Sequence, residues 1–285
     1  METDQFQAGL TLLNNPILPL ARLVQILFIS GPFSSVAEVL AELNEPIETN
    51  TSSYNDPQAV LTPYLDILEE YQRMKNGQAL PCQILDADNN QLDPLEALGL
   101  WVSQKLLTRE LETINSLLCA PCGCTLCCIG PDDSHSQLFF EIPLSREESD
   151  LFSLPSIDTD DSRQQTPYSE TILVLDGKPF FDHGPAIYHW QSGLSMILPK
   201  GASCPKLLDD GRCAVYPKRP DVCRRPQIFP YVLEPSTDVE GEKPFTAQRK
   251  LLAIWDCPYV KQYKNEIAAY AEICELEPVF KENKS

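Results

Sequence analysis

The sequence predicts an α+β protein in which a helical N-terminal region, residues 1–116, precedes a cysteine-rich and loop-rich domain, residues 117–285, with short strands and a C-terminal helix. Two observations support this division. Apolar residues in the first part recur at helical spacing between Pro and Asn residues that punctuate the chain. Ten of the eleven cysteines follow residue 116, and signals for a strand and a hairpin lie among them.

The first expected helix starts at Asp56-Pro57 or at Thr62-Pro63, because either pair supplies a cap followed by a proline suited to the first turn. It ends at Asn76-Gly77, a pair typical of helix C-termini. One face of this helix carries the apolar residues Leu61, Leu65, Leu68 and Tyr71.

A stretch before the next helix, "DADNNQLDPLEA", imitates a calcium-binding loop through Asp86, Asp88 and Asn90. Gln91 replaces the required glycine, however, and Ala97 replaces the bidentate acid, so we interpret the stretch as a polar turn. The following helix begins where this turn ends, at the pair Asp-Pro of "LDPLEA", and its apolar spacing leads directly into the first cysteine group.

The second half shows short elements of both kinds. "LFFEIPL" predicts a strand, and Ser145 with Glu148 predicts a capping box at a helix start. The polar segment 156–170 predicts a surface loop, and "TILVLDGKPFF" predicts a hairpin with Asp176-Gly177 as its turn. A final helix starts with Pro258 in its first turn. Its buried face is expected to carry Tyr259, Tyr263, Ile267, Tyr270 and Cys274.

Composition limits the classes of function. The 285 residues are 43% hydrophobic, enough for a core, and the net charge of -19 disfavours nucleic acid and anionic membranes as partners. The N-terminus has no basic leader, and the apolar run after Arg22 is interrupted by Gly31 and Pro32. We therefore expect a cytoplasmic protein, without nucleic acid or membrane partners, and leave a protein partner for the N-terminal region open. In that reducing compartment an odd number of cysteines predicts thiols and not disulfides.

The first cysteine group, "CAPCGCTLCC", places five thiols within ten residues. Pro121 and Gly123 predict a loop whose backbone amides turn toward sulfur. Sulfur ligands select zinc, iron–sulfur clusters or copper(I). Because adjacent side chains diverge on a regular backbone, the last two cysteines are hard to place on one ion, so either one is idle or a cluster or second ion is present. The group consists of Cys119, Cys122, Cys124, Cys127 and Cys128.

The second group, "CPKLLDDGRCAVYPKRPDVCRRP", contains Cys204, Cys213 and Cys223. Six basic residues accompany these thiols in an acidic chain, and a basic surround offsets the negative charge of thiolate sites. Cys257 precedes the last helix, where the positive end of the helix dipole favours a thiolate, and is a plausible distant ligand. Cys82 stands alone on an apolar stretch and, like the cysteine of the last helix, is expected to be structural.

These residues resemble the YkgJ-type cysteine-cluster family, named for its CxxCxxCC signature and described as zinc- or iron-chelating. Cys119 and Cys122 match the leading pair of the signature, and Cys127-Cys128 matches the closing pair, with two extra residues between the pairs, one of them Cys124. The second signature is matched in order by Cys204, Cys213, Cys223 and Arg224, with "DCP" at Cys257 as the trailing cysteine. The resemblance covers about residues 117 to 260. It implies bound iron or zinc. A relative of that family is described as a protein lysine methylase of flagellin, and this is the only enzymatic activity that the resemblance suggests.

The sequence therefore predicts residues 117–285 as a cysteine-cluster metal-binding domain that holds an iron–sulfur cluster or zinc, with a slight preference for the cluster because ligand histidines are absent. Whether Cys124 replaces one of the eight predicted ligands stays open. Two alternatives are a metal-dependent protein lysine methyltransferase-like enzyme, although the sequence has no G-x-G-x-x-G fingerprint, and a thiol–disulfide redox protein. The predicted ligands are Cys119, Cys122, Cys127, Cys128, Cys204, Cys213, Cys223 and Cys257.

Overall fold

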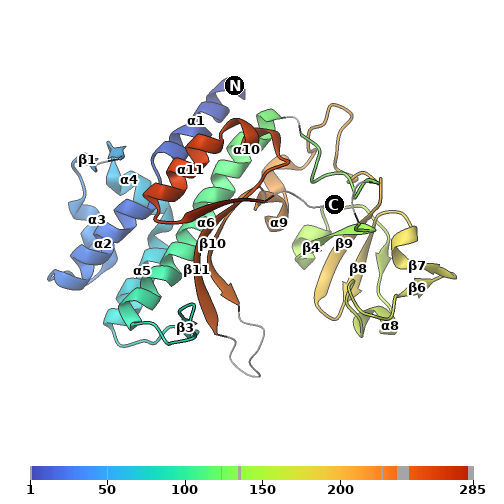
Figure 1. Ribbon diagram of the computed structural model, residues 1–285, viewed down its shortest axis with the longest axis horizontal. Coiled ribbons are helices and arrows are strands. Elements are labelled where there is room, and N and C mark those ends of the chain that lie inside the picture. The colour runs from blue at the N-terminus through green and yellow to red at the C-terminus, as the bar shows by residue number, and fades with distance from the viewer. Residues whose placement is uncertain are drawn as a thin grey trace. The chain divides into compact units, whose positions relative to one another are not determined.

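The computed structural model describes residues 2–49, 51–122, 124–133, 136–225, 227–235 and 244–281. N-terminal helices are followed by several small sheets and C-terminal helices, which confirms the predicted α+β class (Figure 1). The chain forms two compact units, one made of residues 1–118 and 227–281 (unit 1) and one made of residues 119–226 (unit 2).

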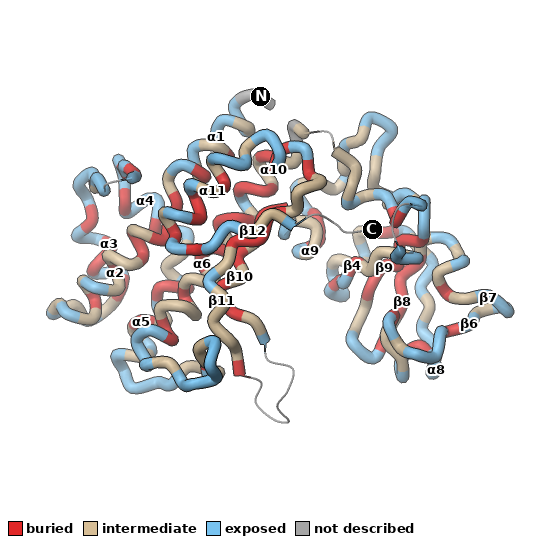
Figure 2. Tube along the Cα trace, viewed as in Figure 1, coloured by how far each residue is buried: buried red, intermediate tan, exposed pale blue. Residues whose placement is uncertain are grey.

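Unit 1 is mainly helical. Its helices are α1 (Glu2–Asn14), α2 (Leu18–Ser30), α3 (Val36–Glu42), α4 (Pro57–Leu61), the 3₁₀ turn η1 (Thr62–Tyr64), α5 (Leu65–Lys75), α6 (Pro94–Cys122), α10 (Pro258–Gln262) and α11 (Lys264–Ile273). Buried residues follow one side of α6, and each fully buried leucine there contributes about 2 kcal/mol (Figure 2). In the described part of the chain no single helix is long and apolar enough to span a membrane, although α1 from Asp4 and α2 together pass that test as a pair bent by 47°.

The helix predicted from residue 56 or 62 is present but interrupted. Asp56 caps α4 by accepting the N–H of Ala59 (2.9 Å), and η1 then leads into α5. The chain leaves α5 at Asn76, and Gly77 takes the left-handed conformation (φ 82°) that glycine tolerates. Local capping signals therefore set both ends of this region as expected.

The main sheet of unit 1 lies beside α6 (Figure 1). Its strands are β10 (Ile228–Pro235), β11 (Phe245–Ile254), β12 (Glu277–Lys281) and β3 (Ile84–Leu85). Strand β11 pairs antiparallel with β10 and parallel with β12 and β3. A bulge in β10 is held by Gln104 of α6, whose Oε1 accepts the N–H groups of Val232 and Leu233 (2.9 and 3.0 Å). A separate two-stranded ribbon joins β1 (Ile47–Glu48) and β2 (Ser53–Tyr54).

The sequence-based division placed residues 117–285 in one domain, but the chain returns to unit 1 at Gln227. Asn115 of α6 holds this return. Its Oδ1 accepts the N–H groups of Gln227 and Ile228 (3.1 Å each) and the hydroxyl of Tyr259, and its Nδ2 donates to the carbonyl of Ile228 (2.8 Å). These partners lie more than 110 residues away in sequence, so short-range patterns do not reveal the return.

A buried carboxyl group joins three helical segments of unit 1. Glu110 of α6 accepts the N–H of Ile17 (2.9 Å) and the hydroxyl of Tyr270 on α11 (2.5 Å). Burial raises the pKa of Glu110 to about 8, although both hydrogen bonds oppose the shift. The group is therefore mostly protonated in the folded protein at neutral pH, and the free energy of unfolding of unit 1 should fall as the pH rises from about 4.5 to about 8.

Unit 2 is built on a four-stranded sheet in the order β4 (Phe139–Leu144), β9 (Gly193–Pro199), β8 (Ala186–Trp190) and β5 (Ser156–Ile157). The predicted strand is confirmed as β4. Both sheet faces are covered, which explains why β8 and β9 read as nearly continuous apolar runs. The remaining elements are β6 (Val174–Leu175), β7 (Lys178–Pro179), α7 (Arg146–Ser149), α8 (Asp160–Arg163), α9 (Asp221–Arg224) and the 3₁₀ turns η2 (Phe180–Asp182) and η3 (Tyr216–Lys218).

Two local predictions in unit 2 are confirmed. Strands β6 and β7 form the expected hairpin, and both of its turn residues, Asp176 and Gly177, have positive φ (50° and 78°). Ser145 and Glu148 form the expected capping box of α7. The segment expected as a surface loop, residues 156–170, instead contains β5 and α8, because Thr159 and Ser162 form a second, unforeseen capping box.

Candidate functional site

The candidate site begins at the end of α6. The helix continues to Cys122, so Cys119 and Cys122 lie on its last turn and not in the expected loop. Residues three apart in a helix share a face, so both thiols leave the helix on the same side. Gly123 lies outside the described residues.

A tight turn follows from Cys124 to Cys128. The N–H of Leu126 donates to Cys124 Sγ (3.4 Å), and the N–H of Cys128 donates to the carbonyl of Thr125 (2.8 Å). The sulfur atoms of Cys127 and Cys128 lie 3.9 Å apart. The expectation that these neighbours diverge was wrong because the turn is not a regular backbone. In a tetrahedral zinc site with Zn–S bonds of about 2.3 Å, two ligand sulfurs lie about 3.8 Å apart.

The next residues bring the two cysteine groups side by side. The N–H of Cys204 donates to the carbonyl of Cys128, and the N–H of Gly130 donates to the carbonyl of Ala202 (both 2.7 Å). A Cβ on Gly130 would lie 1.9 Å from the carbonyl oxygen of Pro199, so this crossing requires glycine. The two segments thus converge, as the metal hypothesis requires. Sequence reasoning missed Gly130, although a glycine two residues after the cysteine group is a usable signal.

The loop after Cys204 folds back on itself. Gly211 turns the chain with a positive φ of 81°, as its Asp-Gly pair suggests, and Leu207 pairs with Cys213 across the loop. Burial raises the pKa of the Cys204 thiol, while the backbone N–H groups of Lys206 and Leu207 act against this shift. Amides directed at sulfur favour the thiolate, the form that binds metal.

Cys223 approaches the same region on the short helix α9. Glu148 of α7 anchors this helix by accepting the N–H of Asp221 (2.7 Å). Cys204 and Cys223 both pack against the same apolar cluster, which includes Ile142 and Leu198 of the sheet. Burial, followed by the charges of neighbouring thiols, raises the pKa of Cys223 to about 12.

One cation is buried among these thiols. Arg219 is 8% exposed, and its guanidinium lies over the ring of Tyr216 at 3.8 Å. Burial and nearby thiols raise the pKa of Cys119 to about 11, and the charge of Arg219 opposes both this shift and that of Cys223. The sequence indicated basic residues here, but only the structure distinguishes the buried Arg219 from the other five, which are exposed or half-buried.

The adjacent thiols Cys127 and Cys128 have different environments. Cys127 is exposed, and the hydrogen bond from Cys128, with help from its own backbone and from Arg219, lowers its pKa to about 7. The same hydrogen bond and burial raise the pKa of Cys128. One of the two thiols therefore ionises readily while the other keeps its proton.

The thiols gather without forming a finished coordination sphere. Among the described residues, no three Cys, His, Asp or Glu side chains are placed so that they could hold one metal ion. The donor set nevertheless suits a soft metal, because all eight cysteines of unit 2 are free and share one unit. A cysteine side chain has one torsion with three staggered wells, so its sulfur can be redirected without moving the backbone.

The other cysteines belong to unit 1. Cys257 is buried (2% exposed) as the N-cap residue of α10, and its role as a distant ligand stays a prediction. Cys274 is buried as expected, and Cys82 is partly buried. In the calcium-like stretch, Asp86 accepts the N–H groups of Asp88 and Asn90 (2.8 Å each), which makes it a polar turn.

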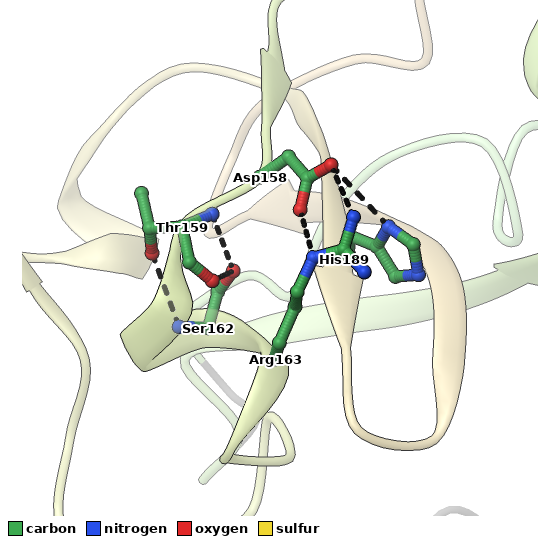
Figure 3. A network of polar contacts seen from close by, with 5 residues as sticks. All are labelled: Asp158, Thr159, Ser162, Arg163 and His189. Carbon is green, nitrogen blue, oxygen red and sulfur yellow. Dashed lines mark hydrogen bonds and ion pairs between the residues drawn. The ribbon is translucent and has the colours of Figure 1, made fainter.

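A second polar network in unit 2 contains a histidine. Asp158 accepts hydrogen bonds from Arg163 Nε at Oδ1 (2.6 Å) and from Arg163 Nη2 at Oδ2 (2.8 Å), and His189 Nδ1 lies 3.6 Å from Oδ2 (Figure 3). The hydroxyls of Thr159 and Ser162 are used in the capping box of α8. This network joins α8 to strand β8.

Comparison of the chain with protein-family models, curated proteins and solved structures finds no match. The family resemblance therefore stays a prediction that rests on the two cysteine signatures.

Proposed function

We propose that unit 2 is a metal-binding module that holds an iron–sulfur cluster or zinc through clustered cysteines in a cytoplasmic protein. The observation that carries the proposal is the hydrogen bond between Cys204 and Cys128, which joins the two thiol-bearing segments. Eight thiols then share one unit of about a hundred residues, a density that packing alone does not require.

The surroundings of the thiols support the same function. Backbone amides act on the sulfurs of Cys124 and Cys204, and hydrogen bonds of this kind tune thiolate sites. Arg219 adds a buried positive charge, which offsets the negative charge of several thiolates. A zinc ion would tie the segments together, and a cluster would supply one-electron chemistry.

Anaerobic purification of the full chain tests this function. We expect bound zinc, or iron with acid-labile sulfide and absorbance near about 400 nm, the sulfur-to-iron charge-transfer region of such clusters. Cys213→Ser should bind less metal than the wild type, whereas Cys82→Ser, which removes a partly buried thiol of unit 1, should bind as much. A metal-free wild-type protein that gains none from added zinc or iron and sulfide would exclude the proposal.

A second candidate, thiol–disulfide exchange, is favoured by one observation. Cys127 is exposed, has a pKa lowered to about 7 by Cys128 and its backbone, and lies 3.9 Å from that partner sulfur. A metal-free chain whose Cys127 is alkylated fastest and whose thiols cycle with glutathione would favour it. The methyltransferase alternative stays a prediction, tested by transfer of a labelled methyl group from S-adenosylmethionine.

A further inference from the structure

The thiols of unit 2 fall into two sets when their backbone positions are compared. The first set lies on one short stretch of chain: two cysteines on the last turn of α6 and two in the turn that follows. After burial, the charges that raise the pKa of Cys119 come from the other three members. This set is Cys119, Cys122, Cys124 and Cys127.

The second set is assembled from three segments. The backbone N–H of Cys204 donates to the carbonyl of Cys128 (2.7 Å), and the N–H of Leu207 donates to the carbonyl of Cys204 (2.9 Å). Leu207 also forms a β-bridge with Cys213. Cys223 packs against the same apolar cluster as Cys204. The negative charges of Cys204 and Cys213 also raise the pKa values of Cys128 and Cys223. This set is Cys128, Cys204, Cys213 and Cys223.

The two sets meet at one peptide bond. Cys127 and Cys128 are neighbours in sequence, and their sulfurs lie 3.9 Å apart, but the carbonyl of Cys128 accepts the N–H of Cys204 from the second set, whereas Cys127 lies in the turn that begins at Cys124. The negative charge of Cys127 raises the pKa values of thiols in both sets, including Cys119 and Cys223. Four thiols are the full ligand set of a structural zinc ion and of the common cubane and rhombic iron–sulfur clusters.

We infer that unit 2 contains two adjoining four-thiol sites, Cys119/Cys122/Cys124/Cys127 and Cys128/Cys204/Cys213/Cys223, each of which holds its own zinc ion or iron–sulfur cluster. The inference rests on the proposed metal-binding function. It differs from the sequence-based ligand set because Cys124 becomes a ligand, Cys128 joins the later segment, and Cys257 is not needed. Both sites lie wholly within unit 2.

Metal stoichiometry tests the inference. The reduced, metal-free full chain is titrated anaerobically with Co²⁺, whose tetrahedral thiolate complexes are strongly coloured, and zinc, iron and sulfide are measured in the protein as purified. We expect two Co²⁺ per wild-type chain. Cys124→Ser and Cys213→Ser should each keep one tetrahedral Co²⁺, half the wild-type amount, and the double variant should keep none. Cys257→Ser, which removes a thiol outside both sets, should keep two.

Circular dichroism identifies variants that fail to fold, and Cys122→Ser and Cys204→Ser repeat the test within each set. One Co²⁺ per folded wild-type chain, or loss of all metal from both folded single variants, would show a single shared centre and overturn the inference while leaving the proposed function intact. Full retention of two Co²⁺ by Cys124→Ser would also overturn it. A folded wild-type chain that binds no metal would instead overturn the proposed function itself.

Discussion

The crossing at Gly130 gives the sharpest test of how the fold builds the thiol site. In Gly130→Ala the new Cβ would meet backbone atoms, at 1.9 Å from the carbonyl oxygen and 2.8 Å from the carbonyl carbon of Pro199. Such atoms essentially never approach closer than 3.0 Å, so the segments must separate by about 1.1 Å at this point. The obstacle is backbone on both sides, so no side-chain rotation relieves it.

That separation weakens the hydrogen bonds that hold the two cysteine groups together. The bonds from Gly130 to Ala202 and from Cys204 to Cys128 are 2.7 Å long, and a shift of this size takes them beyond hydrogen-bonding distance. With about 1 kcal/mol lost for each bond, the cost is about 2 kcal/mol. If metal binding requires the crossing, affinity should fall about 30-fold, since about 1.4 kcal/mol corresponds to a factor of ten.

The assay is competition between the reduced protein and a chromophoric zinc chelator. Gly184→Ala is the matched control, because Gly184 belongs to the same unit and a Cβ there meets nothing within 4 Å. We expect the control to bind zinc as tightly as the wild type. Wild-type affinity in Gly130→Ala would refute the argument that this crossing positions the thiols.

Three further predictions concern buried polar groups. Asn115→Ala removes the side-chain partner of the buried N–H and carbonyl of Ile228 at the start of β10 and should lower the unfolding free energy by about 2–4 kcal/mol in urea denaturation followed by circular dichroism. Burial raises the pKa of Glu110 to about 8, so the unfolding free energy of the wild type should fall as the pH rises from about 4.5 to 8, by up to about 1.4 kcal/mol per pH unit. Glu110→Gln should remove that fall when thermal unfolding is measured across this pH range. An unchanged pH profile would contradict this. The charge of Arg219 lowers the pKa values of Cys119 and Cys223, so Arg219→Gln should shift the pH midpoint of zinc binding upward, whereas Arg219→Lys should shift it less. Equal midpoints in the wild type and both variants would exclude a charge effect.

Short-range sequence signals predicted the elements that depend on neighbouring residues. The hairpin at Asp176-Gly177 needs only two residues that tolerate positive φ, and the capping box at Ser145 needs only a glutamate three positions later. The density of cysteines and the basic residues around the second group likewise indicated a thiol site. These features are local, so they are visible in the order of residues alone.

The sequence by itself determined the α+β class, the supply of thiols and the local turns of the chain. Tertiary structure alone decided that Cys128 lies beside Cys204, that Arg219 is the buried cation, and that the chain returns to Asn115 at Gln227. Each of these depends on contacts between residues far apart in the chain, which form only when apolar surfaces are buried together. Such contacts therefore produce no periodic or short-range pattern in the sequence.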